Sequence, residues 1–505
     1  MDHATSSSRA NWLVAAFLLV MALAFQGSRP LFDPDEGRYT AVALQMLDSG
    51  NWLMPQFNVY QDHLTKPPMT YWALASSMAL FGQNEWAARL PNALAFWLTG
   101  LLVLLLGRRF VPDRPWLPAL VWGSGVVTAL GANVINTDTL LALFETAAMV
   151  AWLRSRDADA SAWRWRLLMW SAFGLAFFTK GPPALLPLLP IVVISTLEGG
   201  WRQALSVFDW LGVLIFLVLG GWWFVALMLQ RPELVEYFLG YELRDRLLSD
   251  VHKRNAEWYG AFKIYLPILA LMMLPWICMR IGWISGIWRG RRLGWWRQCW
   301  MRDRQRVVLL LWILLPLVVF FLARSRLYLY LLPLAVPMAL LIGRDLSLRI
   351  PTPMPRRWLI GLGLCSLVIL GMKGAGSTLT GSKDARRFAA QIQQLAPETE
   401  RLLFSDVTAR YGLRFYLQVP VQQVGRTHSN SPLARAQTEN VLCDQVRAYP
   451  KSLVITRGLA MGKRMLPEAR PECPGIVFQS LQPDSGLWRV DWAQSQVQPA
   501  SPTPW

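Results

Sequence analysis

Long apolar runs separated by short polar connections dominate the first 372 positions of the chain. Most runs are about 16 to 25 residues long, which is the length that a helix needs to cross the hydrocarbon core of a bilayer. The pattern predicts an α-helical polytopic membrane protein with about 11 to 13 spanning helices. Eleven runs are distinct, at 11–27, 89–108, 115–131, 138–153, 165–179, 182–197, 207–229, 260–285, 307–323, 326–343 and 357–372.

The connection between the first two runs, at 28–88, is unusually long. It contains two amphipathic segments, 34–49 and 67–82, that are too short or too polar to cross a bilayer. We expect both segments to form helices that lie along the membrane interface, and we expect 232–248 to form a third helix of this kind.

Beyond about residue 373 the long apolar runs stop, and short strand-like and helix-like patterns follow. The chain is therefore predicted to have two domains. One is a membrane domain at 1–372 that includes the loop 28–88, and the other is a small α/β domain at 373–505, with a disordered tail after Gln496. The predicted helices lie at 382–396 and 431–447, and the predicted strands lie at 402–405, 419–424, 453–456, 476–479 and 488–492.

Composition agrees with a membrane protein, because 54% of the 505 residues are hydrophobic and only 16% are charged. The run at 12–25 also resembles the apolar part of a signal peptide. Its small-residue triplet at 22–24 lies inside the apolar run, with no polar stretch before it, so we predict a retained helix.

The net charge of +18 comes from arginines that cluster in the connections between spans. If the N-terminus is cytoplasmic, the basic connections all fall on the cytoplasmic side, as the positive-inside rule requires, and the C-terminal domain lies outside. This distribution indicates anionic membrane lipids as partners and argues against nucleic acid. The basic connections lie near 108–114, 154–166, 198–206, 286–306 and 344–357.

The opposite face carries few charges, and they come from many different loops. Charged side chains next to the membrane on one face indicate a functional site there. These residues are Asp35, Arg38, Lys66, Asp138, Lys180, Glu242, Arg244, Arg246, Arg324 and Arg326.

Residues 33–39, with the sequence DPDEGRY, follow the first apolar run. Asp33 suits an N-cap, Pro34 suits the first helical position, and Glu36 suits a capping box. The remaining residues, Asp35, Arg38 and Tyr39, share one helical face at the spacing i, i+3, i+4. We favour a site on this face over a solvated helix end.

Two lysines precede prolines that suit helix starts: residues 66–68 read KPP and residues 180–183 read KGPP. A lysine beside the exposed N–H groups of a helix start forms a cradle for a phosphate or pyrophosphate. The alternative for each of these residues, Lys66 and Lys180, is a side chain that extends from a span end to the interface.

Other candidate residues have simple alternatives. Asp138 opens a span and is either a helix-start acid or a second functional carboxylate. Arg326 and Tyr330 lie at a short outer turn, where they contact lipid headgroups or bind a specific anion. His63 and His252 leave a metal site open, although no Ser-His-acid, P-loop or HExxH motif is present. In the C-terminal domain, Cys443 and Cys473 are either free or paired with each other.

Over much of its length the chain resembles a known family. The matching motifs are PDEGRY at 34–39, KPPMTYW at 66–72, AARLP at 87–91, DTL at 138–140, FTKGP at 178–182, and SRL with YLLP between 325 and 333. They resemble the polyprenyl-phosphate-sugar glycosyltransferases of the C-type membrane fold, over about residues 10–345. Within that group the chain is most similar to bacterial lipid A aminoarabinose transferases, which are relatives of the protein O-mannosyltransferases.

The resemblance implies an inverting enzyme of the bacterial inner membrane, with its C-terminal domain in the periplasm. It would transfer 4-amino-4-deoxy-L-arabinose from undecaprenyl phosphate to lipid A, and polymyxin resistance would follow. Alternatives are another sugar delivered to O-antigen, another lipid or a protein, and, from a different class, a transporter of lipid-linked solutes. No metal or cofactor is required by the resemblance, and a divalent metal stays open.

The resemblance also implies roles for individual residues. Asp35 would be the catalytic carboxylate, Asp138 a second acidic group, and Arg38, Tyr39, Glu36 and His63 would organise the site. The carrier phosphate would be bound by Lys66, Arg246, Lys180, Tyr330 and Arg326. The chain departs from the family at His63, where a tyrosine is common, and at Thr65, where an acid is common.

Overall fold

The computed structural model describes residues 2–157, 161–245, 255, 257–276, 303–351, 354–378, 381, 383–425, 433, 436–438, 441–456, 476–481 and 487–492. It divides into two compact units. The membrane unit is formed by Met1–Arg29 and Thr65–Leu379, and the second unit is formed by Pro30–Leu64 and Thr380–Trp505.

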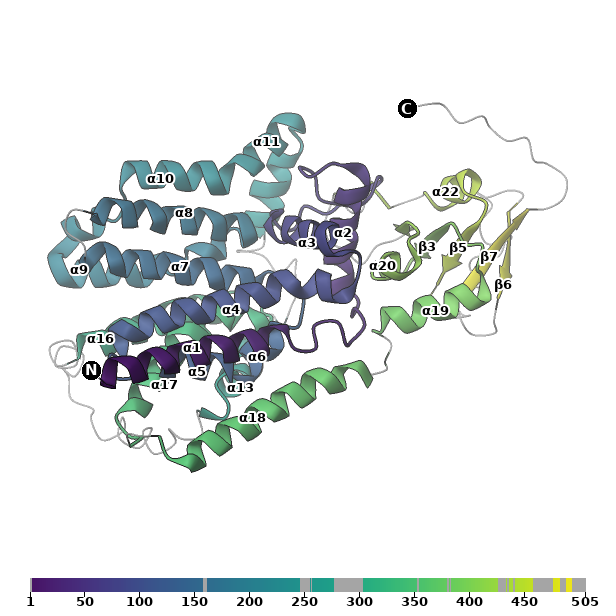
Figure 1. The fold of residues 1–505 in the computed structure, drawn as a ribbon. Coiled ribbons are helices and arrows are strands. Elements are labelled where there is room, and N and C mark those ends of the chain that lie inside the picture. Colours follow the sequence, from purple (N-terminus) through teal and green to yellow (C-terminus); the bar gives the residue numbers. More distant parts are fainter. Residues whose placement is uncertain are drawn as a thin grey trace. The chain divides into compact units, whose positions relative to one another are not determined.

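The membrane unit is entirely helical over its described residues, and most of its helices lie side by side in Figure 1. Because each span is apolar on several faces, the helices pack against one another through leucine, valine and aromatic side chains. Its elements are α1 (Asp2–Leu23), α3 (Met69–Phe81), α4 (Glu85–Phe110), α5 (Trp116–Gly123), α6 (Val126–Gly131), α7 (Asp138–Asp157), α8 (Ala162–Lys180), η1 (Pro182–Leu185), α9 (Leu188–Leu205), α10 (Trp210–Phe216), η2 (Leu217–Gly221), α11 (Trp222–Gln230), η3 (Glu236–Asp245), α13 (Gly260–Met272), α16 (Arg304–Leu322), η5 (Tyr328–Leu334), α17 (Ala335–Ser347), α18 (Arg356–Ala375) and η6 (Gly376–Thr378).

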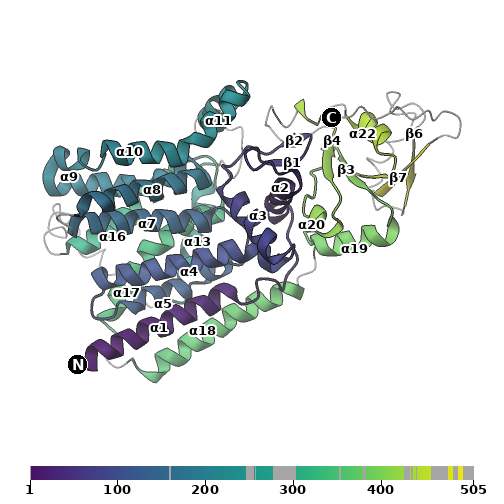
Figure 2. The same cartoon turned by 45° about the horizontal axis from the view of Figure 1, so that its top comes forward.

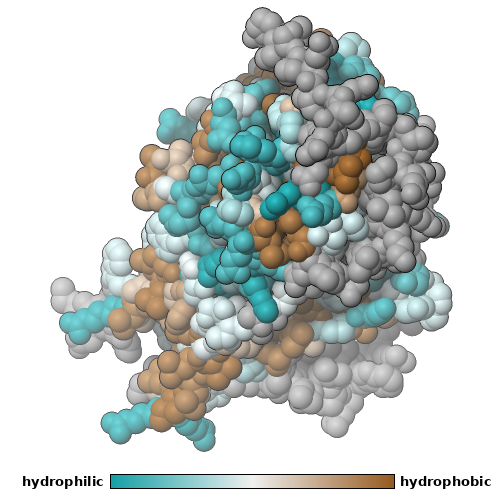
Figure 3. All heavy atoms as spheres, turned by 90° about the vertical axis from the view of Figure 1, so that its right-hand side faces the viewer, coloured by the Kyte–Doolittle hydropathy of each residue, from teal (hydrophilic) through white to brown (hydrophobic). Residues whose placement is uncertain are grey.

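Six of the described helical segments are long and apolar enough to cross a membrane, and two shorter apolar helices, Arg9–Leu23 and Gly260–Met272, accompany them. Large hydrophobic side chains stay exposed on several of these helices, and brown hydrophobic surface is visible in Figure 3. In water such surface would be unfavourable, whereas lipid tails cover it without cost. The prediction of a multi-pass helical membrane protein is confirmed.

The predicted span at 115–131 is in fact two helices, α5 and α6. The break falls at Ser124 and Gly125, where the Ser124 hydroxyl donates to the Leu120 carbonyl at 2.7 Å and Gly125 is extended. Trp276 donates its indole N–H to the same hydroxyl at 2.8 Å, so the break is fully hydrogen-bonded. The predicted span at 260–285 is described only as far as Trp276, and its helix α13 ends at Met272.

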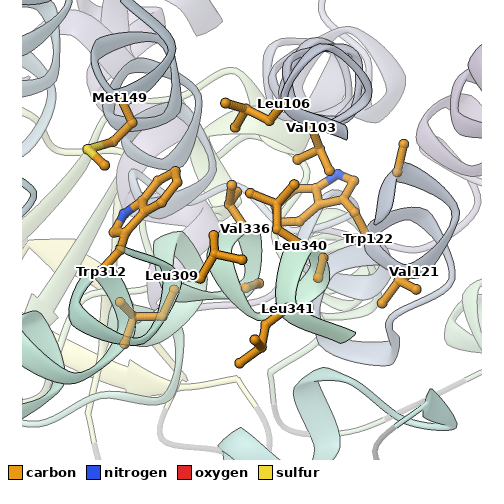
Figure 4. Packing of buried hydrophobic residues seen from close by; sticks show 14 of the residues in the cluster. Val103, Leu106, Val121, Trp122, Met149, Leu309, Trp312, Val336, Leu340 and Leu341 are labelled. Carbon is orange, nitrogen blue, oxygen red and sulfur yellow. The ribbon is translucent and has the colours of Figure 1, made fainter. Parts of the chain in front are cut away.

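The core of the membrane unit lies between α4, α5, α7, α16 and α17. Figure 4 shows Trp122 and Trp312 among aliphatic side chains that include Val103, Leu106 and Leu340. All five side chains are buried. Such mixed aromatic and aliphatic packing stabilises the helices that carry the candidate residues.

Arg89 is a fully buried cation near the start of α4. Its guanidinium donates to the carbonyls of Gln26 and Arg29 at 2.8 and 2.9 Å, so it fixes the chain where α1 ends. We expect Arg89→Leu to lower the free energy of unfolding by at least about 2 kcal/mol, because two buried carbonyls lose their donor. Thermal unfolding of the full-length protein in detergent measures this loss. Arg108→Leu, at an exposed position of the same helix, is the control, and equal losses for the two variants would contradict the prediction.

The second unit contains a five-stranded sheet of order β4-β3-β5-β7-β6. The strands β4, β3 and β5 are parallel, and β7 and β6 are antiparallel to their neighbours, so the predicted small α/β domain is present. The predicted helix at 431–447 is interrupted, because Gln437 and Thr438 lie in a turn and α22 begins only at Leu442. The elements are α19 (Ala385–Leu395), β3 (Arg401–Ser405), α20 (Leu413–Leu417), β4 (Val421–Val424), α22 (Leu442–Ala448), β5 (Ser452–Ile455), β6 (Ile476–Ser480) and β7 (Leu487–Trp492).

The same unit also includes residues from the first loop, which the sequence did not lead us to expect. They form α2 (Asp35–Ser49) and a small hairpin of β1 (Gln56–Asn58) and β2 (Gln61–Asp62), which Figure 2 shows beside β4. Asn58 donates to the Val421 carbonyl at 2.9 Å, and Gln61 donates to the Gln423 carbonyl at 2.8 Å. Side-chain amides thus satisfy backbone groups of the edge strand β4.

Cys443 in α22 is disulfide-bonded. Cys473, the partner that the sequence left open, lies outside the described residues.

Candidate active site

Two groups of candidate side chains stand out, and they belong to different units. We call Asp35, Glu36, Arg38 and Tyr39 the α2 cluster, and Asp138, Glu145, Lys180, Tyr265 and Tyr330 the membrane cluster. The α2 cluster lies in the second unit, and the membrane cluster lies in the membrane unit. Arg246 is outside the described residues.

The helix α2 carries the predicted acid and arginine on one face, as the i, i+3 spacing requires. Asp35 is exposed and forms an ion pair with Arg38, whose Nε also donates to the Pro34 carbonyl at 3.2 Å. Gly50, at φ 69°, ends the helix in the left-handed conformation that glycine adopts readily. An exposed carboxylate with a single guanidinium partner can accept a further proton donor or ligand.

The start of α2 differs from the prediction in one respect. Pro34 occupies the N-cap position without a side-chain cap, and Asp33 is not the cap. The Asp33 carboxylate instead accepts a hydrogen bond from the Gly412 amide at 2.9 Å. Glu36 is buried and its carboxylate accepts from the Phe32 amide at 3.0 Å, which is close to the predicted capping interaction.

Burial raises the pKa of Asp33 to about 6, against the opposing influence of the Gly412 hydrogen bond and of the Arg410 and Arg38 charges. A carboxyl whose pKa is higher in the folded than in the unfolded state stabilises the fold while it is protonated, and this contribution is lost as the pH rises through about 6. The shift corresponds to about 3 kcal/mol. We expect Asp33→Asn to unfold at a higher temperature than the wild type at pH 8 and at nearly the same temperature at pH 4. Melting curves at the two pH values test this, and a constant difference between the proteins would contradict it.

His63 lies outside the α2 cluster, in the chain after the hairpin. Its ring centroid is 4.3 Å from that of Phe57, and Phe57 stacks at 3.8 Å on Tyr411. Over the described part of the chain no group of three His, Cys, Asp or Glu side chains is placed to hold a metal ion. His252 lies outside the described residues.

The membrane cluster is centred on a buried ion pair between Asp138 and Lys180. Asp138 is the first residue of α7 and Lys180 is the last residue of α8, so the antiparallel packing of these helices brings the two side chains together. The side chains are only 8% and 5% exposed, respectively. Lys180 Nζ also lies 4.0 Å from the ring centroid of Tyr330, which comes from η5.

The placement of Lys180 changes the interpretation of its sequence. The prolines at 182 and 183 start only a four-residue 3-10 turn, η1, and Lys180 precedes that turn as the end of a long helix. Its ammonium is held by a carboxylate and an aromatic face rather than by a helix start. The cation is therefore fixed and desolvated, which strengthens its interaction with an anion that comes within reach.

Two members of the membrane cluster were not singled out in the sequence. Glu145 lies seven residues after Asp138 on the same face of α7, is 5% exposed, and is within electrostatic range of Lys180 and Asp138. An acid inside an apolar run was the available signal. Tyr265 in α13 is fully buried, and its hydroxyl has no partner among the described residues. Nothing in the sequence distinguishes it from a tyrosine of the core.

The other predicted phosphate ligands are placed differently. Lys66 is half-buried just before α3, whose N-cap is Pro68. Arg326 is buried, and its guanidinium donates to the carbonyls of Asn255, Glu257 and Phe321 at 2.7, 2.8 and 3.3 Å. These bonds organise the connection that precedes η5.

Comparisons with known proteins show which family and which solved structures the chain is similar to. Residues 65–223 match the family described as dolichyl-phosphate-mannose-protein mannosyltransferase. The chain is 32% identical to undecaprenyl phosphate-α-4-amino-4-deoxy-L-arabinose arabinosyl transferase 2 of Pseudomonas fluorescens, over 71% of this chain and 63% of the relative. It is 33% identical to the corresponding transferase of Pseudomonas aeruginosa, over 68% of this chain and 61% of the relative. The match thus spans less than two thirds of the length of these relatives.

Two solved structures share the fold. ArnT from Cupriavidus metallidurans, bound to undecaprenyl phosphate, superposes with a TM-score of 0.71 at 21% identity, covering 97% of this chain and 99% of that chain. The oligosaccharyltransferase AglB from Archaeoglobus fulgidus superposes with a TM-score of 0.54 at 12% identity, covering 97% and 75%.

Proposed function

We propose that this chain, which belongs to the membrane glycosyltransferases of the C-type fold, transfers 4-amino-4-deoxy-L-arabinose from undecaprenyl phosphate to a phosphate of lipid A. The observation that carries the proposal is the 32–33% identity to transferases named for that donor, over about 70% of the chain. Because the chain differs from the family pattern at His63 and Thr65, we keep a runner-up function, which is transfer of another sugar to O-antigen, another lipid or a protein.

The reaction breaks the bond between the sugar C1 and the oxygen of the carrier phosphate, and it forms a bond between C1 and an oxygen of the acceptor. Undecaprenyl phosphate leaves with the bonding electron pair, and the configuration at C1 inverts. The departing phosphate gains negative charge, so the reaction is accelerated by cations that are already in place and dehydrated. Lys180 meets this description, and Lys66 and Arg246 are the further cations that the family resemblance assigns to the phosphate.

Asp35 is the carboxylate that we assign to the acceptor side of the reaction. A lipid A phosphate is already ionised and needs no base, so Asp35 would orient the acceptor and balance charge near C1. A hydroxyl acceptor would instead need Asp35 to take its proton. Arg38, which pairs with Asp35, would hold the carboxylate in one orientation.

The buried Asp138–Lys180 pair favours the enzyme over the transporter alternative. Because Lys180 is buried in an ion pair with Asp138 and lies within electrostatic range of Glu145, its ammonium is held in one place before a phosphate binds. The transporter alternative would instead predict charged residues distributed between two repeated halves. No repeat is visible in the sequence.

We also propose that the protein is located in the bacterial inner membrane, with the N-terminus in the cytoplasm and the C-terminal domain in the periplasm. The distribution of arginines supports this orientation.

Mass spectrometry of lipid A tests the proposed function. We expect the aminoarabinose adduct on lipid A to disappear when the gene is deleted and to return when it is supplied on a plasmid. Polymyxin sensitivity should change in parallel. If the adduct is unaffected while O-antigen or glycoproteins lose a sugar, the runner-up function is correct. If purified protein moves a lipid-linked solute across vesicles without turnover, the enzyme proposal is wrong.

A further inference from the structure

Asp33 connects the start of α2 to the C-terminal part of the chain. Its side chain accepts from the Gly412 amide at 2.9 Å, and its own amide donates to the Lys383 carbonyl at 3.0 Å. The neighbouring residue Leu31 accepts from the Ala385 amide at 3.2 Å. Asp33 is 4% exposed, so these bonds are shielded from water.

Two glycines, Gly37 and Gly412, allow this close contact, because a side chain at either position would clash with it. A Cβ atom on Gly37 would lie 2.0 Å from Asp33 Oδ1 and 2.4 Å from the Gly412 nitrogen. A Cβ atom on Gly412 would lie 2.9 Å from Asp33 Oδ1 and 3.0 Å from Oδ2. The first turn of α2 therefore rests directly on the backbone of the C-terminal domain, next to the Asp33 carboxylate.

Charge links this contact to the α2 cluster. Arg38, the ion-pair partner of Asp35, is also within electrostatic range of Asp33, as are Arg410 and Glu36. Asp33 and Asp35 thus both interact electrostatically with the same guanidinium. The second carboxylate oxygen of Asp33 has no hydrogen-bond partner among the described residues. Burial of an unpaired carboxylate oxygen destabilises the fold, which indicates that Asp33 has a role other than stability.

We propose that Asp33 is a positioning residue, through which the C-terminal domain fixes the first turn of α2 and thereby the orientation of Asp35 and Arg38. Asp33 is too deeply buried to touch a substrate. It acts through the hydrogen bond that its carboxylate accepts from the Gly412 amide. The C-terminal domain is then a structural part of the transferase centre rather than an appendage. The catalytic part of this inference rests on the proposed role of Asp35.

The experiment uses the full-length protein in detergent with four variants. Asp33→Ala removes the acceptor, and Asp33→Asn keeps an oxygen acceptor for Gly412 without the charge. Gly412→Ala crowds the carboxylate, while Gly381→Ala adds a methyl group to the same unit at a position with open space. Hydrogen exchange of the amides in 35–49 and steady-state transfer from the undecaprenyl-phosphate-linked sugar are measured for each variant.

We expect Asp33→Ala and Gly412→Ala to speed exchange in the first turn of α2 and to lower kcat by about 100-fold, with a smaller change in KM, because a misplaced catalytic group affects the transition state most. Asp33→Asn should restore slow exchange and most of kcat, and Gly381→Ala should match the wild type. Unchanged exchange in Asp33→Ala would overturn the positioning role. An equal loss of exchange protection in Asp33→Asn and Asp33→Ala would overturn the assignment to the Gly412 hydrogen bond.

A wrong proposed function would give a different result from a wrong positioning role. In that case the wild type itself transfers no aminoarabinose, while exchange in α2 still responds to Asp33→Ala. The positioning of α2 by the C-terminal domain would then stand, and only its connection to transfer would be withdrawn.

Discussion

Asp35→Asn is expected to abolish transfer while leaving the protein folded. The variant keeps the size of the side chain but removes the charge that pairs with Arg38 and that we assign to the acceptor side of the reaction. We expect a loss of about 100-fold to 10,000-fold in kcat, the range for removal of a positioned acid or base. Because the Asp35 side chain is 72% exposed, the thermal unfolding temperature should hardly change. Turnover of the lipid-linked donor by purified protein measures the effect.

Asp444→Asn is a matched control for this variant. Asp444 is also an exposed acid in the second unit, with an arginine, Arg447, three residues later in its helix. It should retain wild-type activity. If Asp35→Asn is as active as Asp444→Asn, Asp35 has no catalytic role and the carboxylate must be sought elsewhere.

Removing Lys180 is expected to have the second large effect, on both stability and activity. Lys180→Met leaves Asp138 and Glu145 buried without a cation, and loss of one partner of a buried pair costs about 3–5 kcal/mol. Transfer should be lost as well, because the leaving phosphate loses a fixed positive charge. Asp138→Asn combined with Lys180→Met should recover part of the stability but none of the activity.

Thermal unfolding and donor turnover of the two single variants and the double variant form a double-mutant cycle. Lys451→Met serves as the control, because Lys451 pairs with Glu400 at the surface, at 3.1 Å. It should change neither property appreciably. Additive losses of stability in the cycle would show that Asp138 and Lys180 do not act as a pair.

The spans were predictable because the bilayer imposes one length and one polarity on every crossing helix. The helix at 138–153 and the helix at 357–372 are accordingly close to α7 and α18. The prediction was poorer where a polar interaction inside the protein decides the local structure, as at Ser124, where a single hydroxyl and a distant tryptophan divide one apolar run into two helices.

The candidate site was predictable where the residues share one helix. Asp35 and Arg38 were placed correctly from their spacing alone. The partner of Lys180 could not be predicted, since Asp138 lies 42 positions away and meets it only through the packing of α7 against α8. Asp33 was assigned to the wrong role for a similar reason: its true partner, the Gly412 amide, carries no sequence signal and lies 379 positions away.

The long sequence separation between the first loop and its partners in the C-terminal domain also matters while the chain is being synthesised. The segment 30–64 emerges early, yet its partners at Val421 and Gly412 are made 363 and 379 residues later than the residues they contact. At about 5–20 residues per second this interval is roughly 20 to 75 seconds. During that time the hairpin and α2 lack the partners that bury their polar groups, so a chain that stops short of the C-terminal domain carries an unfinished first loop. The C-terminal domain therefore decides whether the first loop reaches its final structure.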